Sequence, residues 1–416
     1  MPLGPSEDSF GPPFRPHRVF APSDRRLTIW DGESQVGIPV LLVATTTTWF
    51  GTARIPRVLA DAGFKVSLLT PRHSLAEASR FVSKIDYLAD HATSMEWFEA
   101  FAAMVKATSP RLVIPCDDMA FRLLASVVIA PPRGVRAELQ LQLAALVRVS
   151  LGDPAHYRMS VDKTLLPPLA ETLGVLVPPY TIITDLAGAE DFVARHKYPV
   201  VLKRGHGFAG QGVAICDNYG ELARAFAAFA VANAKEIRET AGDSYLLQTY
   251  VTGSVQYFHA VAWQGELMAG WALEKLVANP APTGPPTMTR YFSGTRLRQI
   301  AANLARGLGI SGLFFAEFIV DAATGTPNLL EINRRVSPAL HRGTLWNVDL
   351  CAALFGALEG TASKSRTALD AADEGTIVHF PQEWLRDPQS PYLRQYPSDV
   401  PWDEPELMEA LLKLRQ

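Results

Sequence analysis

Two apolar runs in the C-terminal half of the chain each carry a carboxylate that could bind a metal ion. Glu317 lies inside the run LFFAEFIVD, and Glu331 ends the run NLLE. The segment ATGTP between them would fold the two runs into a hairpin. Asn333 follows Glu331 by two residues, so both side chains would point to the same face of an extended chain. Two carboxylates and an amide oxygen are hard oxygen ligands, which predicts a Mg²⁺ site, with Mn²⁺ as an alternative.

Burial of an isolated carboxylate in such an apolar run would be costly, so Glu317 needs a partner. A metal ion is the partner that we expect. An ordinary salt bridge at the end of a strand is the alternative interpretation of both carboxylates.

A glycine-rich segment upstream could bind phosphate. Lys203 ends the apolar run PVVL, and a glycine-rich loop follows before a strand pattern resumes at Val213. Glycines let backbone N–H groups approach an anion closely, and Lys203 would add a positive charge. The loop has neither the Walker nor the Rossmann pattern, so it becomes informative only together with the carboxylates. The loop glycines are Gly205, Gly207, Gly210 and Gly212.

Taken in order, these segments resemble the ATP-grasp superfamily over about residues 155–350. The resemblance implies that Lys163 opens a helix, and that Lys163 and Lys203 bind the phosphates of ATP under a glycine-rich lid. It also implies that the segment LLQTYVTG is a hinge whose backbone pairs with adenine. The other expected nucleotide contacts are Gln248, Thr249, Tyr250 and Val251 in the hinge, Gln256 near the ribose, and Lys275 near a proline-rich loop.

By the same resemblance, Glu317, Glu331 and Asn333 are the Mg²⁺ ligands. Arg335 is then the arginine of the family's E-x-N-x-R pattern, which contacts the phosphate in transfer. Enzymes of this kind use ATP to convert a carboxylate into an acyl phosphate, and an amine then displaces the phosphate. The resemblance therefore implies a ligase that acts on a small-molecule acid and a small-molecule amine.

The acid should approach the γ-phosphate from the side opposite the nucleotide. We expect that side to be lined by the residues after Arg335, by the proline-rich loop 279–287, and by strand ends near residues 45–50 and Asp117. An anionic substrate needs a fixed cation, and Arg290 is the candidate beside the loop. Lys203, Arg290 and Arg335 are the expected catalytic residues. For Arg290, as for Lys275, a charge on the rim of the site is an open alternative.

Some residues depart from the family pattern. Gln248 stands in the hinge where a glutamate is common, although an amide can still bond to adenine. Arg334 replaces a common proline. The threonine and Pro-Gly pair that follow the asparagine in D-alanine–D-alanine ligases are missing. The closer resemblance is to the carbamoyl-phosphate-synthase-like and carboxylate–amine ligase branches.

Composition agrees with a multidomain enzyme. The chain has 416 residues, 48% of them hydrophobic and 19% charged, with a net charge of −3. This balance gives no electrostatic reason to expect nucleic acid or membrane as a partner. Cys116, Cys216 and Cys351 are far apart and odd in number, which disfavours disulfides and zinc and predicts a cytoplasmic protein. No apolar run reaches membrane-spanning length, and no signal-peptide core is seen. A homo-oligomer is left open.

The order of patterns predicts an α/β fold: an α+β ATP-grasp fold after a half-Rossmann-like parallel sheet. Residues 1–35 are rich in Pro, Gly and Ser and predict a loosely ordered arm. In residues 36–150 the strand runs GIPVLLVA, FKVSLLT and RLVIPC alternate with helical patterns. The ATP-grasp domain would span residues 151–365, with a lid subdomain at about 165–250. Residues 366–416 would form a C-terminal extension that packs on the core.

Two other classes of function stay open at this stage. One is an ATP-grasp protein that phosphorylates a hydroxyl or joins the acid to a thiol. The other is a nucleotide-binding protein without turnover. Arg335 disfavours the second class, because binding alone does not need an arginine on the moving phosphate. The acceptor cannot be read from the sequence, since acceptor specificity lies in loops without motifs.

Overall fold

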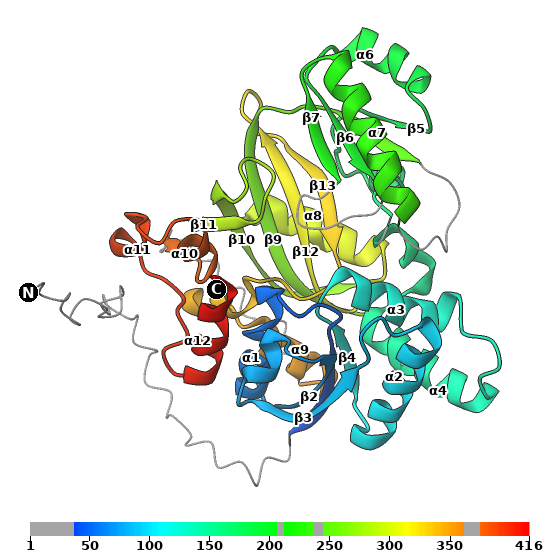
Figure 1. Cartoon of the computed structure of the whole chain (residues 1–416), viewed down its shortest axis with the longest axis vertical. Helices are drawn as coiled ribbons and strands as arrows, with labels where there is room; N and C mark the ends of the chain where they lie inside the picture. Colours follow the sequence, from blue (N-terminus) through cyan, green and yellow to red (C-terminus); the bar gives the residue numbers. More distant parts are fainter. Residues whose placement is uncertain (1–36, 161, 206–211, 236–243, 362–374, 416) are drawn as a thin grey trace, which may run out of the picture.

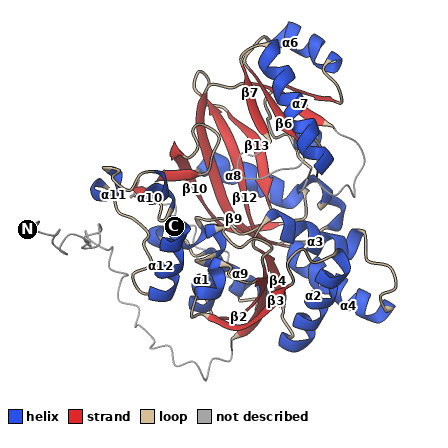
Figure 2. Ribbon diagram, in the orientation of Figure 1, coloured by secondary structure: helices blue, strands red, loops and turns tan. Residues whose placement is uncertain are grey.

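The computed structural model describes residues 37–160, 162–205, 212–235, 244–361 and 375–415. The predicted arm and the loop glycines Gly207 and Gly210 lie outside the described residues. Three sheets organise the chain, and the predicted α/β class is confirmed (Figure 1, Figure 2). No helix within the described ranges is both long and apolar enough to cross a membrane.

The N-terminal sheet consists of four parallel strands in the order β3-β2-β1-β4. Its strands are short buried runs, as is typical of a sheet that is covered on both faces. The strands are β1 (Ile38–Val43), β2 (Phe64–Pro71), β3 (Val82–Leu88) and β4 (Leu112–Pro115). One face packs on α2 (Ser94–Thr108), α3 (Asp118–Ile129) and α4 (Ala137–Leu151). The other packs on α1 (Ile55–Asp61) and α9 (Leu350–Leu358).

The central sheet has six antiparallel strands in the order β13-β12-β9-β10-β11-β14. Phe258, Ala260 and Phe314 point from one face onto α8 (Thr295–Gly307) and α5 (Leu166–Thr172). Their sequence neighbours point to the opposite face, which shares a core with the N-terminal sheet. The strands are β9 (Gly253–Trp263), β10 (Glu266–Ala278), β11 (Pro286–Phe292), β12 (Gly312–Asp321), β13 (Pro327–Asn333) and β14 (Gly375–Val378).

The third sheet, which we call the lid sheet, lies beyond the end of the central sheet that is farthest from the N-terminal sheet (Figure 1). Its antiparallel order is β5-β8-β6-β7. Leu202 and Leu247 pack against α6 (Glu190–His196) and α7 (Tyr219–Lys235), so the adjacent Lys203 and Gln248 point from the opposite face. The strands are β5 (Tyr180–Ile183), β6 (Val200–Arg204), β7 (Val213–Cys216) and β8 (Tyr245–Thr249).

The last part of the chain contacts both the central sheet and the N-terminal region. Strand β14 pairs with β11 at the edge of the central sheet. Helix α12 (Pro405–Leu412) packs on Ala53 and Leu75, and the hydroxyl of Ser79 donates to Glu404 at 2.7 Å. Two short helices, α10 (Gln382–Arg386) and α11 (Tyr392–Gln395), lie between β14 and α12. The C-terminal segment thus closes the side of the molecule where the two regions meet.

Lys163 does not open a helix, so this prediction was wrong. Helix α5 begins at Leu166, and Lys163 lies in the turn before it. The prolines of Leu166-Pro167-Pro168 explain the difference, because proline favours the first turn of a helix, where its missing N–H is not needed. The hairpin of β12 and β13 is confirmed, whereas β3, α3 and α4 were not identified from the sequence.

Gly152 ends α4, and a substitution there tests whether the close contact between this position and Gly309 contributes to stability. Gly152 has a φ of +85°, and a Cβ there would collide with the carbonyl oxygen of Gly309. Gly134 also has a positive φ, of +83°, but has open space around it. We expect Gly152→Ala to lower the free energy of unfolding by at least about 2 kcal/mol more than Gly134→Ala, measured by urea denaturation. Equal losses would show that only the backbone conformation matters.

Candidate functional site

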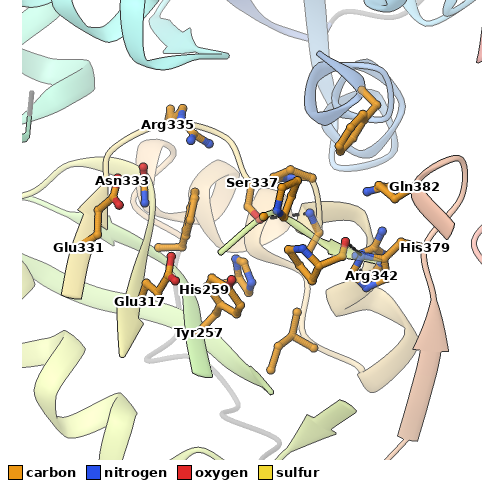
Figure 3. Close-up of a pocket in the computed structure, with 18 of the residues that line it drawn as sticks. Tyr257, His259, Glu317, Glu331, Asn333, Arg335, Ser337, Arg342, His379 and Gln382 are labelled. Atoms are coloured by element: carbon orange, nitrogen blue, oxygen red, sulfur yellow. Dashed lines mark hydrogen bonds between the residues drawn. The ribbon is translucent and has the colours of Figure 1, made fainter. Parts of the chain in front are cut away.

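Glu317 on β12 and Glu331 on β13 lie directly opposite each other in the hairpin. Asn333 lies opposite Phe315 in the next pair on the same face, so the three polar side chains form one group (Figure 3). Like charges opposed across two strands destabilise a sheet. Burial raises the pKa of Glu317 above its ordinary value of 4.5, with a further increase from Glu331 that Lys275 opposes. The pair therefore needs positive charge nearby.

Three lysines from different segments supply that charge. Lys163 Nζ lies 3.2 Å from Glu331 Oε2, and its backbone N–H donates to Gly205 O at 2.7 Å. Lys203 is buried, and burial together with Lys163 lowers its pKa from 10.5 to about 8, against the two glutamates. Lys275 lies over the ring of Tyr257, with Nζ 5.9 Å from the centroid.

The donor set fits Mg²⁺. In the part of the chain that the structure describes, no three His, Cys, Asp or Glu side chains are grouped to hold a metal. The site instead offers two carboxylates and the buried Asn333 amide. Mg²⁺ takes few protein carboxylates and completes its shell with water and phosphate oxygens, so this smaller set is adequate. It would also relieve the repulsion between Glu317 and Glu331.

Arg335 lies above these carboxylates and is held by the N-terminal region. Its Nε donates to Asp118 Oδ1 at 2.8 Å. Its guanidinium carbon lies 5.7 Å from the ring centroid of Trp49 and 5.2 Å from that of Phe315. The adjacent Arg334 points elsewhere, to the carbonyl oxygen of Leu151. Arg335 alone of the two lines the pocket.

In the segment that we predicted to be a hinge, at the end of β8, two backbone N–H groups already form hydrogen bonds within the protein. The backbone N–H of Thr249 donates to Pro179 O at 2.9 Å, and that of Tyr250 to Pro199 O at 3.3 Å. The neighbouring Val251 is half-buried. Gln248 Oε1 is buried and has no hydrogen-bond partner among the described residues. Gln248 shares a face of the lid sheet with Lys203, so a nucleotide base bonded to this amide would lie on the lysine side.

Two expected site residues are not brought to the site. Gln256 precedes Tyr257 on β9, so its side chain points to the α8 face. Arg290 on β11 also points away from the pocket and forms an ion pair with Glu274. The adjacent Thr289 points toward the pocket face instead, where its hydroxyl bonds to His379 Nε2 at 2.8 Å. Neither Gln256 nor Arg290 is among the described residues that line the pocket.

Gly205 and Gly212 are the loop glycines that the structure describes. Gly212 has a φ of +80°, and its carbonyl accepts from the N–H of Arg204 at 2.9 Å. Gly205 and Gly212 are thus the described residues on either side of residues 206–211, and Gly205 follows Lys203 by two residues.

The pocket is open to solvent, and its empty space, open solvent included, is about 740 Å³. Its lining includes parts of three segments that we expected there: residues 49–50, residues 283–286 of the proline-rich loop, and residues 337–339 after Arg335. Asp117 is not part of the lining. The pocket runs from the carboxylates to Arg342, His379 and Gln382 (Figure 3). The alternation of side chains along β9 could have identified Tyr257 and His259 as pocket residues. No local sequence motif marks His379 and Gln382. The lining residues beyond the predicted ligands are Trp49, Phe50, Tyr257, His259, Leu273, Thr283–Pro286, Phe315, Ser337, Pro338, Ala339, Arg342, His379 and Gln382.

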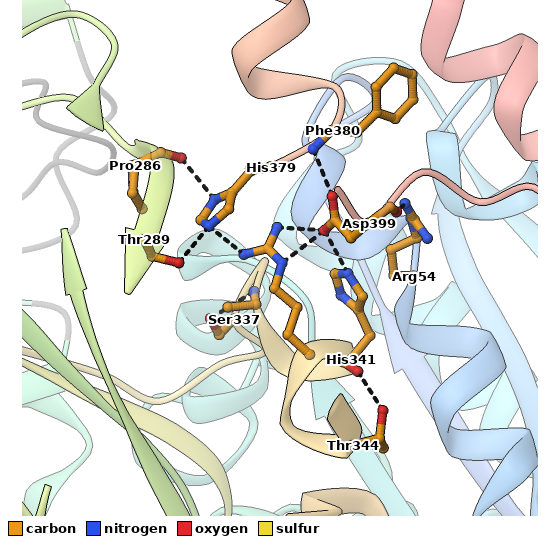
Figure 4. Close-up of polar contacts among 11 residues, drawn as sticks. Arg54, Pro286, Thr289, Ser337, His341, Thr344, His379, Phe380 and Asp399 are labelled. Carbon is orange, nitrogen blue, oxygen red and sulfur yellow. Dashed lines mark hydrogen bonds and ion pairs between the residues drawn. The ribbon is translucent and has the colours of Figure 1, made fainter. Parts of the chain in front are cut away.

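A buried polar cluster closes the far end of this pocket. Asp399 Oδ2 accepts from Arg342 Nε at 2.8 Å and lies 2.8 Å from His341 Nε2. Figure 4 shows Asp399 between His341 and the backbone of Phe380, whose N–H donates to it at 2.7 Å. Although burial raises the pKa of Asp399, Arg342 and His341 hold it well below 3.8. Asp399 therefore neutralises Arg342 and ties the C-terminal segment to the pocket.

No protein-family model and no curated protein matches the sequence. Solved structures are nevertheless similar. The biotin carboxylase domain of Hydrogenobacter thermophilus 2-oxoglutarate carboxylase, bound to MgADP and bicarbonate, has a TM-score of 0.60 at 16% identity, over 80% of this chain and 73% of that one. N5-carboxyaminoimidazole synthetase from Staphylococcus aureus, with ADP, has 0.59 at 11%, over 82% of each chain. L-amino acid ligase from Bacillus licheniformis has 0.58 at 14%, over 81% and 78%. These likenesses show a shared fold.

The cluster at Asp399 predicts how stability depends on pH. Burial lowers the pKa of His341 from 6.5 to about 4, against the opposing effect of Asp399. Between these two pH values the unfolded chain binds a proton that the folded protein does not, so the free energy of unfolding falls as the pH falls. One such histidine contributes about 1.4 kcal/mol per pH unit.

We therefore expect His341→Gln to reduce this slope by about that amount in urea titrations between the two pH values, whatever its effect at neutral pH. An unchanged slope would mean that His341 titrates in the folded protein as it does in the unfolded chain.

Proposed function

Because the chain has the ATP-grasp fold, we propose that it is an ATP- and Mg²⁺-dependent ligase that activates a carboxylate as an acyl phosphate and joins it to an amine. One observation carries the proposal: Glu317 and Glu331 face each other beside Asn333, within the electrostatic reach of Lys163 and Lys203. Similar structures include an amino acid ligase and N5-carboxyaminoimidazole synthetases, which supports this class.

The phosphates would bind between the lid sheet and the hairpin. Lys163 and Lys203 would hold the α- and β-phosphates, and Glu317, Glu331 and Asn333 would hold Mg²⁺. When bound, Mg²⁺ neutralises charge on the β- and γ-phosphates during transfer. Phosphate oxygens near Lys203 would favour its charged form, which burial disfavours in the free protein.

The reaction has two steps. A carboxylate oxygen of the acid attacks the γ-phosphorus, the bond to the β-phosphate oxygen breaks, and ADP leaves. The amine nitrogen then attacks the acyl carbon, inorganic phosphate leaves, and the amine loses a proton. Arg335 would stabilise the moving phosphoryl group and then the anionic oxygens of the acyl phosphate. The enclosing walls of the pocket would keep water from hydrolysing that intermediate.

Hydroxylamine provides a direct test, because it traps acyl phosphates as hydroxamates. The protein would be incubated with ATP, Mg²⁺, hydroxylamine and pools of carboxylic acids, and both ADP and hydroxamate would be measured. Acid-dependent formation of both products in equal amounts supports the proposal. Phosphorylated hydroxyl products would indicate a kinase, and thioesters formed with added thiols a thiol ligase. Nucleotide binding without turnover in any pool would refute an enzymatic role.

The metal site yields a prediction for Glu331→Gln. This change keeps the shape of the side chain but removes a charged ligand and the partner of Lys163. We expect turnover to fall on the order of 10²-fold or more, with the urea unfolding curve little changed. Arg290→Gln is the matched control, because Arg290 points away from the pocket and should leave turnover nearly unchanged. Wild-type turnover in well-folded Glu331→Gln would refute the Mg²⁺ assignment.

Asp118 yields a second prediction, as a positioning residue. Its carboxylate holds Arg335 Nε, so Asp118→Asn should loosen the guanidinium without touching the nucleotide. We expect kcat to fall roughly 10-fold while the KM for ATP stays within about twofold, and Asp118→Glu to restore part of the loss. A rise in the KM for ATP with unchanged kcat would instead place Arg335 in ground-state nucleotide binding.

A further inference from the structure

The far part of the pocket has a different character from the metal end. We call this part the inner chamber, and define it by Trp49, Phe50, His259, Leu273, Arg342, His379 and Gln382. Most of these side chains are aromatic or aliphatic. The chamber is continuous with the site of Glu317, Glu331 and Asn333, so a molecule that fills it can present a carboxylate to the γ-phosphate (Figure 3).

The chamber contains buried polar atoms without partners. Both ring nitrogens of His259 lack a hydrogen-bond partner among the described residues, and the side chain is only 3% exposed. The ring lies 4.8 Å from that of Trp271 and 5.4 Å from that of Phe315. Gln382 Oε1 is likewise buried and unpaired within the part of the chain that is described. Such groups are costly to leave unbonded, so they indicate a ligand that bonds to them.

Charge in the chamber limits what that ligand can be. Burial and Arg342 lower the pKa of His259 from 6.5 to about 3, so the ring is neutral at pH 7. Arg342 carries a positive charge, but it already forms an ion pair with Asp399. Among the described lining residues the only carboxylates are Glu317 and Glu331, at the other end. A ligand ammonium group in the chamber would therefore find no carboxylate among the described lining residues to pair with.

We propose that the inner chamber binds the body of the acid that is activated, and that this acid has an apolar, aryl-sized body with an uncharged hydrogen-bonding group at its far end. A hydroxyl or amide both donates and accepts, as the ring nitrogens of His259 and the oxygen of Gln382 require. His259 and Gln382 are then specificity-determining residues. That the bound acid is the one activated rests on the proposed function.

Binding can be tested without turnover, by calorimetry in the presence of ADP and Mg²⁺. The probes are phenylpropanoate, para-hydroxyphenylpropanoate and para-aminomethylphenylpropanoate, which share one body and differ in the far group. We expect the hydroxyl acid to bind roughly 10-fold more tightly than the plain acid, because it bonds to the unpaired groups. The ammonium acid should bind more weakly than both. The proposal is overturned if the ammonium acid binds best or if none of the three binds.

Two variants separate specificity from structure. His259→Phe keeps an aromatic ring in aromatic surroundings but removes both ring nitrogens, and Gln382→Leu removes the unpaired oxygen. Each should reduce the preference for the hydroxyl acid by roughly 3- to 10-fold, with the affinity for the plain acid unchanged. Equal weakening of both acids in both variants would mean a purely structural role and would overturn the proposal.

The same measurements distinguish this proposal from the ligase function. If the hydroxyl acid binds best but no acid yields hydroxamate, the proposal for the chamber is supported and the proposed ligase reaction is refuted. Hydroxamate could instead form only with acids that carry an ammonium group or a second carboxylate at the end away from the activated carboxylate. That result would support the ligase reaction and refute the proposal for the chamber.

Discussion

The repulsion between Glu317 and Glu331 is the constraint on which the site depends. Two carboxylates opposed on a half-buried sheet face are stable only with positive charge around them. That charge comes from the turn before α5, from the lid sheet and from β10, through Lys163, Lys203 and Lys275. The same electrostatic requirement therefore brings three separate segments together at one end of the central sheet, where it leaves room for a cation.

The parts of the site that follow a local rule could be predicted from the sequence. Alternation along an extended chain places Glu331 and Asn333 on one face, and the intervening turn sets them against Glu317, as the register of β12 and β13 shows. The ATP-grasp fold was expected from the order of these motifs and is confirmed by the shared fold of the solved structures. The alternation of side chains along a strand and the order of motifs along the chain were enough to predict the carboxylate group and the fold.

The parts that depend on distant contacts could not be predicted. Arg290 follows Thr289, and only tertiary contacts show which of them faces the pocket. Arg290 pairs with Glu274 on the opposite face, whereas the hydroxyl of Thr289 bonds to His379. Gln382 belongs to a segment without a motif, and Asp399 holds that segment in place through Arg342. Because such contacts join residues far apart in the sequence, neither composition nor periodicity reports them.

The position of the C-terminal segment has a consequence for the order in which the protein is made. One wall of the pocket contains Trp49, near the start of the described chain, and another contains Gln382, near its end. A growing chain emerges from the ribosome N-terminus first, so the lid sheet and the carboxylate hairpin can form before Gln382 has been synthesised. The carboxylates of Glu317 and Glu331 can thus be set against each other before Gln382 exists to complete the pocket wall.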